Sequence, residues 1–99
     1  MKISITGRHG ELADDLREYA AQKVGKLEKY FGRIQWIKVI LDGHTEPRSA
    51  EIVIGVVRGS TLVAEASAAD LHAAVDLLID KAEHQLTRFK DKLQDKRGR

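Results

Sequence analysis

The apolar residues recur along the chain with two different periods, and the changes of period divide the sequence into six elements. Four segments alternate apolar and polar residues with the period of two that is typical of half-buried strands: 2–6, 34–42, 49–57 and 61–67. Two longer segments, 12–31 and 70–99, repeat apolar residues at steps of three and four, which places them on one face of a helix. Asp70 suits the N-cap of the second helix. The sequence therefore predicts the order β-α-β-β-β-α.

The connections between these segments predict how the strands pair. The helix over 12–31 joins the first two strands, so we expect them to run parallel with a right-handed crossover. The short turn Arg58-Gly59-Ser60 makes a hairpin of the last two strands, and the last three strands form an antiparallel meander. Because every strand alternates, one sheet face is covered and the other is largely open. We predict an α+β fold, a two-layer sandwich in which two helices pack side by side on one face of a four-stranded mixed sheet.

The expected core consists of the residues on the covered side of each element. In the strands these are Ile3, Ile5, Ile37, Val39, Leu41, Ala50, Ile52, Ile54, Val56, Leu62, Ala64 and Ala66. In the helices they are Leu16, Ala20, Val24, Leu27, Phe31, Leu71, Val75, Leu78, Ala82, Leu86, Phe89 and Leu93. We expect a single domain over 1–95, followed by a flexible basic tail over 96–99.

Length and composition limit the class of protein further. The chain has 99 residues, of which 42% are hydrophobic, so it can bury one modest core. It has no run of about 18 apolar residues, so we expect no membrane span. Its N-terminal segment lacks the apolar block of a signal peptide. It has no cysteine, which is compatible with the reducing cytoplasm, and we expect a cytoplasmic protein.

Charged residues are sorted by sign around both predicted helices. On the second helix, four basic residues lie along one flank of the apolar stripe: Lys81, His84, Arg88 and Lys92. The back of this helix and its other flank carry the acidic residues Asp76, Asp80, Glu83 and Asp91. On the first helix, one flank carries Lys23, Lys26 and Lys29. We expect the two basic edges to come together as one positive surface or groove, which suits the phosphates of a folded RNA.

The residues offer little support for catalysis or for a metal or cofactor. His72 and His84 lie twelve positions apart on one helix, about 18 Å at 1.5 Å per residue, which is too far to share an ion. The sequence lacks the glycine-rich phosphate-binding motifs and the hydrolase nucleophile motif. We therefore expect no enzyme, no cofactor, no metal and no small-molecule substrate. Aromatic residues are few, with Tyr30 near the basic edge and Trp36 on the sheet, which favours recognition of phosphates and shape.

Three stretches of the sequence resemble the ribosome hibernation promoting factor family, also called the ribosome-associated inhibitor or sigma-54 modulation protein family. They are Ile5-Thr6-Gly7, the segment Leu16–Ile34, and the segment Asp70–Leu93 with its DLHAAVD, DK, QL and KDK sequences. Together they make the resemblance cover nearly the whole chain. It implies the same β-α-β-β-β-α fold, which is similar to that of double-stranded RNA-binding domains.

The resemblance also implies a function. It implies binding to the small ribosomal subunit and its 16S ribosomal RNA, in the channel where messenger and transfer RNA meet the decoding region, which would block translation in stationary phase or stress. The family's basic positions match Lys23, Lys26, Lys81, Arg88, Lys90 and Lys92. Lys90 lies on the other side of the apolar stripe, so it would serve a different RNA segment. The few residues after Leu93 resemble the short form of the family, which is thought to favour inactive ribosome dimers with a separate small ribosome modulation factor.

Two positions depart from the family pattern. His72 stands where a tyrosine is usual, and His84 stands where an arginine or lysine is common. Because imidazole gains its charge within the physiological pH range, a pH-sensitive contact at His84 is a hypothesis. Two other functions stay open from the residues alone. One is a general double-stranded RNA-binding module, and the other is a protein-interaction domain that uses the open sheet face with Trp36, Ile40, Val53 and Val57.

Overall fold

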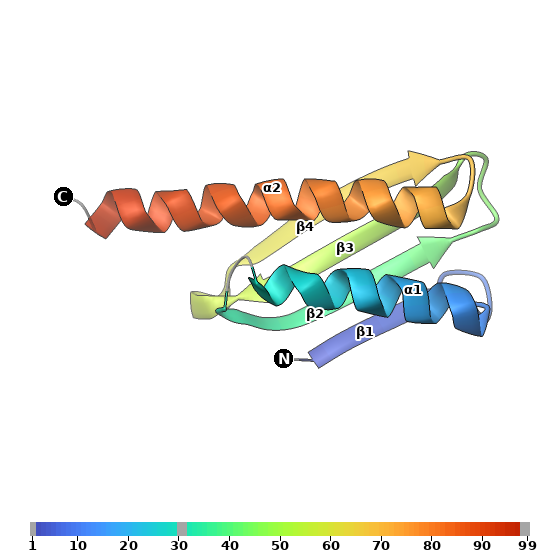
Figure 1. Ribbon diagram of the computed structural model, residues 1–99, viewed down its shortest axis with the longest axis horizontal. Coiled ribbons are helices and arrows are strands. Elements are labelled where there is room, and N and C mark those ends of the chain that lie inside the picture. The colour runs from blue at the N-terminus through green and yellow to red at the C-terminus, as the bar shows by residue number, and fades with distance from the viewer. Residues whose placement is uncertain (1, 30–31, 98–99) are drawn as a thin grey trace.

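A computed structural model describes residues 2–29 and 32–97 of the chain. Its elements are β1 (Lys2–Gly7), α1 (Asp14–Gly25), the 3-10 turn η1 (Lys26–Lys29), β2 (Ile34–Asp42), β3 (Arg48–Val56), the 3-10 turn η2 (Val57–Gly59), β4 (Thr61–Ala68) and α2 (Leu71–Arg97). The strands form one four-stranded sheet, and both helices cover the same face of it (Figure 1). The predicted α+β sandwich and its order of helices and strands are confirmed.

The strands are arranged in the sheet in the order β1-β2-β3-β4. β1 runs parallel to β2, with Ile5 opposite Val39, whereas β2, β3 and β4 are antiparallel neighbours. The crossover through α1 makes the first pair parallel, and the short connections make the rest a meander. Gly59 in η2 has a φ of 74°, so the turn between β3 and β4 depends on a residue without a side chain.

The two helices lie side by side but cover different strands (Figure 1). α2 packs mainly over β4 and β3, whereas α1 packs on β1 and against α2. α2 has 27 residues, which gives it a length of about 40 Å at 1.5 Å per residue. Its C-terminal turns therefore extend past the end of the sheet (Figure 1).

The buried core between the sheet and the helices matches most of the predicted inward positions. In the strands the buried residues include Ile5, Ile37, Val39, Leu41, Ala50, Ile52, Ile54, Val56, Ala64 and Ala66. From the helices they include Leu16, Ala20, Val24, Leu27, Val75, Leu78, Ala82 and Leu86. Leu62, Leu71 and Phe89 are partly buried against this core. Ile3 is 37% exposed, contrary to prediction, because it lies near the free end of the edge strand β1. Phe31 and the side chain of Leu93 lie outside the described part of the chain.

Element boundaries differ from the predicted ones mainly around the first helix. α1 begins at Asp14 rather than at residue 12, because Leu12 packs against the core from the loop that precedes the helix. Lys26–Lys29 forms a 3-10 turn instead of a further α-helical turn. Tyr30 lies outside the described residues, so its predicted position near the basic edge stays a prediction. β3 begins and ends one residue earlier than predicted.

A side-chain cap defines the start of α2, and the helix ends close to the C-terminus of the chain. At its start, the backbone N–H of Ala73 donates to Asp70 Oδ1 at 2.8 Å, which confirms the predicted N-cap. At its end, the helix continues to Arg97. Gly98 and Arg99 lie outside the described residues. The division into a domain over 1–95 and a tail over 96–99 stays a prediction.

Candidate nucleic-acid interface

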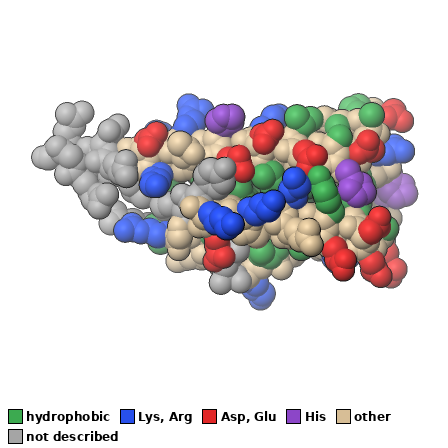
Figure 2. All heavy atoms as spheres, viewed as in Figure 1, with side chains coloured by type: hydrophobic (Ala, Val, Ile, Leu, Met, Phe, Trp, Pro, Cys, Tyr) green, Lys and Arg blue, Asp and Glu red, His purple; other side chains and the backbone are tan. Residues whose placement is uncertain are grey.

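Four basic residues of α2 form a strip along the flank that faces β4, and we name Lys81, His84, Arg88 and Lys92 the β4-side strip. They are three and four positions apart, so successive turns of the helix bring them to the same flank. Lys81, His84 and Arg88 line a shallow hollow with Val63 and Glu65 of β4. Arg88 and Lys92 line a second hollow next to Leu62, at the start of β4. Figure 2 shows basic and histidine side chains along the upper edge of the molecule, where this flank lies.

Lys81 is also bonded to the edge of the sheet. Its Nζ donates to the backbone carbonyl oxygen of Glu65 at 2.7 Å. β4 is an edge strand, so this carbonyl has no neighbouring strand on its outer side. The bond fixes the ammonium group at the start of the β4-side strip, and all four residues of the strip are exposed to solvent.

The basic residues of the first helix lie on a different surface. Lys23 is on the flank of α1 that faces α2, because its Nζ lies 3.6 Å from Asp76 Oδ1 of α2. Lys26 and Lys29 follow in η1 and are exposed. In Figure 2 a line of lysine and arginine side chains runs between the two helices. On α2, helical periodicity places Lys90 on the same flank as Asp76, opposite the β4-side strip.

The expected union of the two basic edges into one surface is therefore wrong. The β4-side strip points away from α1, whereas Lys23 points toward α2. Between them runs the solvent-facing crest of α2, which carries the exposed Asp80 and Asp91. The cause lies in how α2 sits on β3 and β4, since its flank toward α1 is the one with Asp76. The candidate interface consists of two cationic surfaces separated by an acidic ridge.

A polar cluster that the sequence did not reveal joins the two helices. The hydroxyl of Tyr19 on α1 donates to Asp76 Oδ1 at 2.5 Å, and Lys23 Nζ lies 5.4 Å from the centre of the Tyr19 ring. The hydrogen bond to Asp76 raises the pKa of Tyr19, because it stabilises the protonated phenol. Burial and the negative charge of Asp76 raise this pKa too, whereas the positive charge of Lys23 lowers it. The ring of His72 packs beside Tyr19, with 4.8 Å between ring centres.

This cluster involves residues far apart in sequence, which explains why the sequence did not point to it. Tyr19 and Asp76 are separated by 57 positions, and each fits the ordinary pattern of its own helix. Only the packing of α1 against α2 brings them together. The cluster compensates part of the charge of Lys23, so this lysine also has a role in joining the helices.

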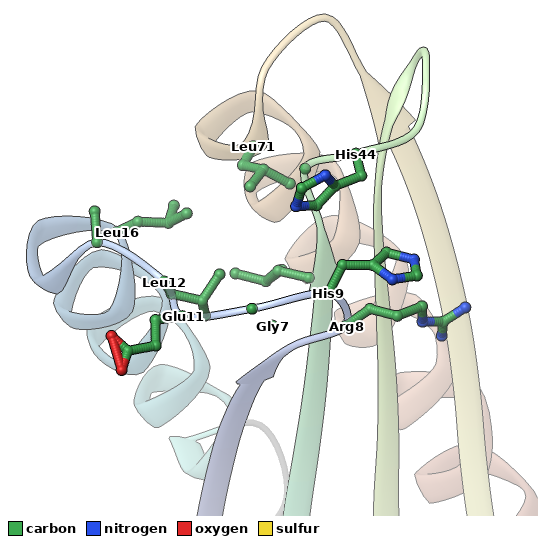
Figure 3. A pocket seen from close by; sticks show the side chains of 12 residues that line it. Gly7, Arg8, His9, Glu11, Leu12, Leu16, His44 and Leu71 are labelled. Atoms are coloured by element: carbon green, nitrogen blue, oxygen red, sulfur yellow. The ribbon is translucent and has the colours of Figure 1, made fainter.

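A second polar cluster lies at the far end of the sheet, around a hollow between the loops after β1 and β2. Figure 3 shows His9 and His44 together on one side of it, with Leu12 from the same loop as His9 and Leu71 from the start of α2. His9 Nε2 lies 3.6 Å from Asp42 Oδ2, and the two imidazole rings are 5.3 Å apart. Asp42 is 4% exposed and accepts a hydrogen bond from the backbone N–H of His44, so it organises this loop. Within the described residues, no group of three His, Cys, Asp or Glu side chains is placed to hold a metal ion.

Comparisons with known proteins match nearly the whole chain to one family. Residues 3–94 match the family model described as Sigma 54 modulation protein / S30EA ribosomal protein. A ribosome hibernation promoting factor of Escherichia coli K12 is 39% identical over 94 residues, which cover 95% of this chain and 98% of that protein. The factor of the same name from Azotobacter vinelandii is 36% identical over 92 residues, covering 93% of this chain and 85% of the relative.

Solved structures agree with the sequence matches. The N-terminal domain of Thermus thermophilus Protein Y superposes with a TM-score of 0.77 at 33% identity, covering 90% of this chain and 99% of that one. A ribosomal subunit interface protein from Coxiella burnetii superposes with a TM-score of 0.83 at 28% identity, covering 92% of this chain and 99% of that one. In the part of the chain that the structure describes, no helix is long and apolar enough to cross a membrane.

Proposed function

Because the chain belongs to the Sigma 54 modulation protein / S30EA ribosomal protein family, we propose that it is a hibernation factor that silences ribosomes. It binds the small ribosomal subunit in the channel for messenger and transfer RNA, near the decoding region. Occupying this channel blocks translation and favours inactive ribosome dimers in stationary phase or stress. The family is one of ribosome-associated factors and not of enzymes, and a non-catalytic role fits the chemistry of the surface.

The observation that best supports this proposal is the β4-side strip. Arg88 and Lys92 are exposed, lie one helical turn apart and border a shallow hollow rather than a deep pocket. Phosphates along an RNA backbone are bound by such rows of cations, and binding releases the counterions that the RNA had condensed. The acidic ridge on α2 disfavours other orientations on a polyanion, because its carboxylates repel phosphates.

The proposed site comprises both cationic surfaces. Its residues are Lys23, Lys26, Lys29, Lys81, His84, Arg88, Lys90 and Lys92. The two surfaces contact separate segments of 16S ribosomal RNA, because the ridge of α2 holds them apart. A separate small ribosome modulation factor completes dimer formation, and the site of action is the cytoplasm, where ribosomes are found.

A ribosome pelleting experiment tests the proposal. We expect the parent chain to sediment with small subunits, and the double variant Arg88→Glu/Lys92→Glu to lose about tenfold or more in affinity, since two contacts become repulsions. The matched control is Arg8→Glu/Arg48→Glu, which changes the net charge by the same amount at the other end of the sheet. Each of these control arginines forms a surface ion pair, with Glu51 and Glu46 respectively, and such pairs contribute little to stability.

Other results would contradict the proposal. If both double variants lose binding equally, net charge rather than the β4-side strip governs the interaction. If the parent chain stays in the supernatant but shifts an unrelated RNA duplex on a gel, the chain is a general double-stranded RNA-binding module. A sedimentation profile of ribosomes with and without the chain shows whether dimers form.

A further inference from the structure

The open face of the sheet carries an aromatic side chain with a cation on each of two sides. In β2, Ile37 and Val39 are buried against the helices, so Trp36 and Lys38 point to the opposite face. Lys2 lies opposite Trp36 in the parallel pairing of β1 with β2. Since Ile5 of β1 is buried, alternation places Lys2 on the open face too. This face therefore presents Lys2, Trp36 and Lys38 as neighbours.

Gly55 allows the indole ring to lie against the sheet. It is the cross-strand partner of Trp36 on β3, and a Cβ at this position would lie 2.2 Å from both Cε2 and Nε1 of the indole. The ring thus covers the Gly55 backbone, yet Trp36 remains 37% exposed. Its accessible part is the side turned away from the sheet. A flat, solvent-facing aromatic surface of this kind is what nucleic-acid bases stack on.

The charges around Trp36 favour an anionic ligand. Lys2 and Lys38 are exposed, and within the described part of the chain neither forms an ion pair with a carboxylate. The acidic residues of this face lie further along, where Glu51 and Glu65 pair in register, and Glu51 is already bonded to Arg8 at 3.3 Å. The end of the face with Trp36 is therefore cationic.

We propose that Lys2, Trp36 and Lys38 form a second nucleic-acid site, which holds an unpaired base of single-stranded RNA. The base stacks on the indole, and the phosphates on its two sides lie near the two ammonium groups. Val53 and Val63 add apolar area to this face, with Val63 47% exposed, but Lys38 lies directly opposite Val53 and interrupts it. A protein partner therefore fits this cationic end of the face less well than RNA does. The choice of RNA rests on the proposed function, whereas the site itself rests on the geometry of the sheet.

Trp36 is the only tryptophan of the chain, so its fluorescence reports on this site directly. The intact chain is titrated at about 50 mM salt with an oligoadenylate of about ten nucleotides, a length within the usual site size. We expect the oligonucleotide to quench the emission and inorganic polyphosphate to leave it largely unchanged. Quenching should persist in Arg88→Glu/Lys92→Glu, because those residues lie on the helical side.

Variants then test the ring itself through the anisotropy of a labelled oligonucleotide. Trp36→Leu should weaken binding about 5- to 150-fold, the range that corresponds to loss of one base stack. Trp36→Phe should retain most of the affinity, since a ring remains. Gly55→Ala keeps the tryptophan but displaces it, so it should weaken binding while net charge stays constant. Melting temperatures of all three variants establish that they are folded.

Three results would overturn this site. The first is equal quenching by polyphosphate, and the second is unchanged oligonucleotide affinity in folded Trp36→Leu. The third is tighter binding of an acidic peptide of equal charge, which would make the face a protein interface.

The proposed function is judged separately, by ribosome pelleting of the Arg88 and Lys92 variants. A chain that pellets with ribosomes but shows no quenching refutes only the second site, and a chain that is quenched but does not pellet refutes only the proposed function.

Discussion

Asp76 contacts two side chains of the other helix at once. Its Oδ1 accepts the hydrogen bond of Tyr19 and lies 3.6 Å from Lys23 Nζ. Two of the predicted RNA-binding lysines thus have partners within the fold: Lys23 pairs with Asp76, and Lys81 donates to the Glu65 carbonyl. Arg88 and Lys92 have no ion pair or side-chain hydrogen bond with another described residue. These two residues are therefore available for an external phosphate, and reversing their charge tests the proposed function.

The raised pKa of Tyr19 predicts a loss of stability in alkaline solution. In the unfolded chain the phenol titrates at its ordinary pKa of 10.0, whereas in the folded chain its pKa is higher because the protonated form donates to Asp76. The folded state therefore holds more protons between the two values, and the stabilising contribution is present below pH 10 and lost as pH rises through the folded value. Urea unfolding of the parent chain from neutral to alkaline pH measures this loss.

Tyr19→Phe provides the reference for that measurement. The variant keeps the ring beside His72 but has no hydroxyl, so the alkaline loss that belongs to Tyr19 should be missing from it. All other titratable groups are the same in both proteins, so their contributions cancel in the comparison. Identical pH profiles for the two proteins would mean that the hydrogen bond to Asp76 does not persist in solution.

At the scale of elements, α2 presents four different surfaces along one helix. Its apolar face carries Leu78 and Leu86 into the core, and its flank toward β4 carries the β4-side strip. Its flank toward α1 holds Asp76, and its crest is acidic. Because each surface has different surroundings, the orientation of α2 about its own axis decides where the cations of this helix are placed.

The start of α2 is fixed by Asp70, and removing this cap should be measurable. Asp70→Ala leaves the backbone N–H of Ala73 without its side-chain acceptor, so we expect the free energy of unfolding to fall by about 1 kcal/mol. For a domain of this size that corresponds to a melting temperature lower by about 4–8 °C. Asp70→Ser retains an acceptor and should keep most of the stability. Equal losses for Ala and Ser would show that the charge, rather than the hydrogen bond, stabilises the helix.

The sequence predicted best the elements in which alternating apolar and polar residues correspond to alternating buried and exposed side chains. Strict alternation placed Ile37, Val39 and Leu41 on the covered face, and the strand over Ile34–Asp42 was predicted at both of its ends. The start of α1 was predicted two residues early because Leu12 contributes an apolar side chain from a loop, which periodicity does not distinguish from a helix.

The role of the predicted site residues stays a prediction, but the structure shows how these residues are arranged, which the sequence did not indicate correctly. A helical wheel correctly groups Lys81, His84, Arg88 and Lys92 on one flank and Lys90 on the other. It does not show which neighbour each flank faces, because that depends on where α2 crosses the sheet and on which side α1 lies. The contact of Lys23 with Asp76 and the open-face position of Trp36 above Gly55 are likewise products of tertiary packing.

At the scale of the whole molecule, the cationic surfaces should be visible in the salt dependence of ribosome binding. Each phosphate that a cation neutralises contributes a slope of about −0.7 to −0.9 to the plot of log affinity against log salt concentration. Arg88→Gln should therefore reduce the magnitude of the slope by about this amount. Arg8→Gln, at the far end of the sheet, should leave it unchanged. A flat salt response of the parent chain would indicate an interaction that does not depend on phosphates.

The bond between Lys81 and Glu65 also governs how copies of this chain behave toward one another. An unprotected edge strand recruits strands of other molecules, and a charged lysine at the edge opposes this, since growth of the sheet would desolvate the ammonium group. Lys81→Leu should therefore aggregate at concentrations at which the parent chain and Lys81→Arg stay dispersed, as light scattering would measure. In the proposed function this lysine has two roles, since it keeps copies of the chain apart and also belongs to the proposed RNA-binding surface.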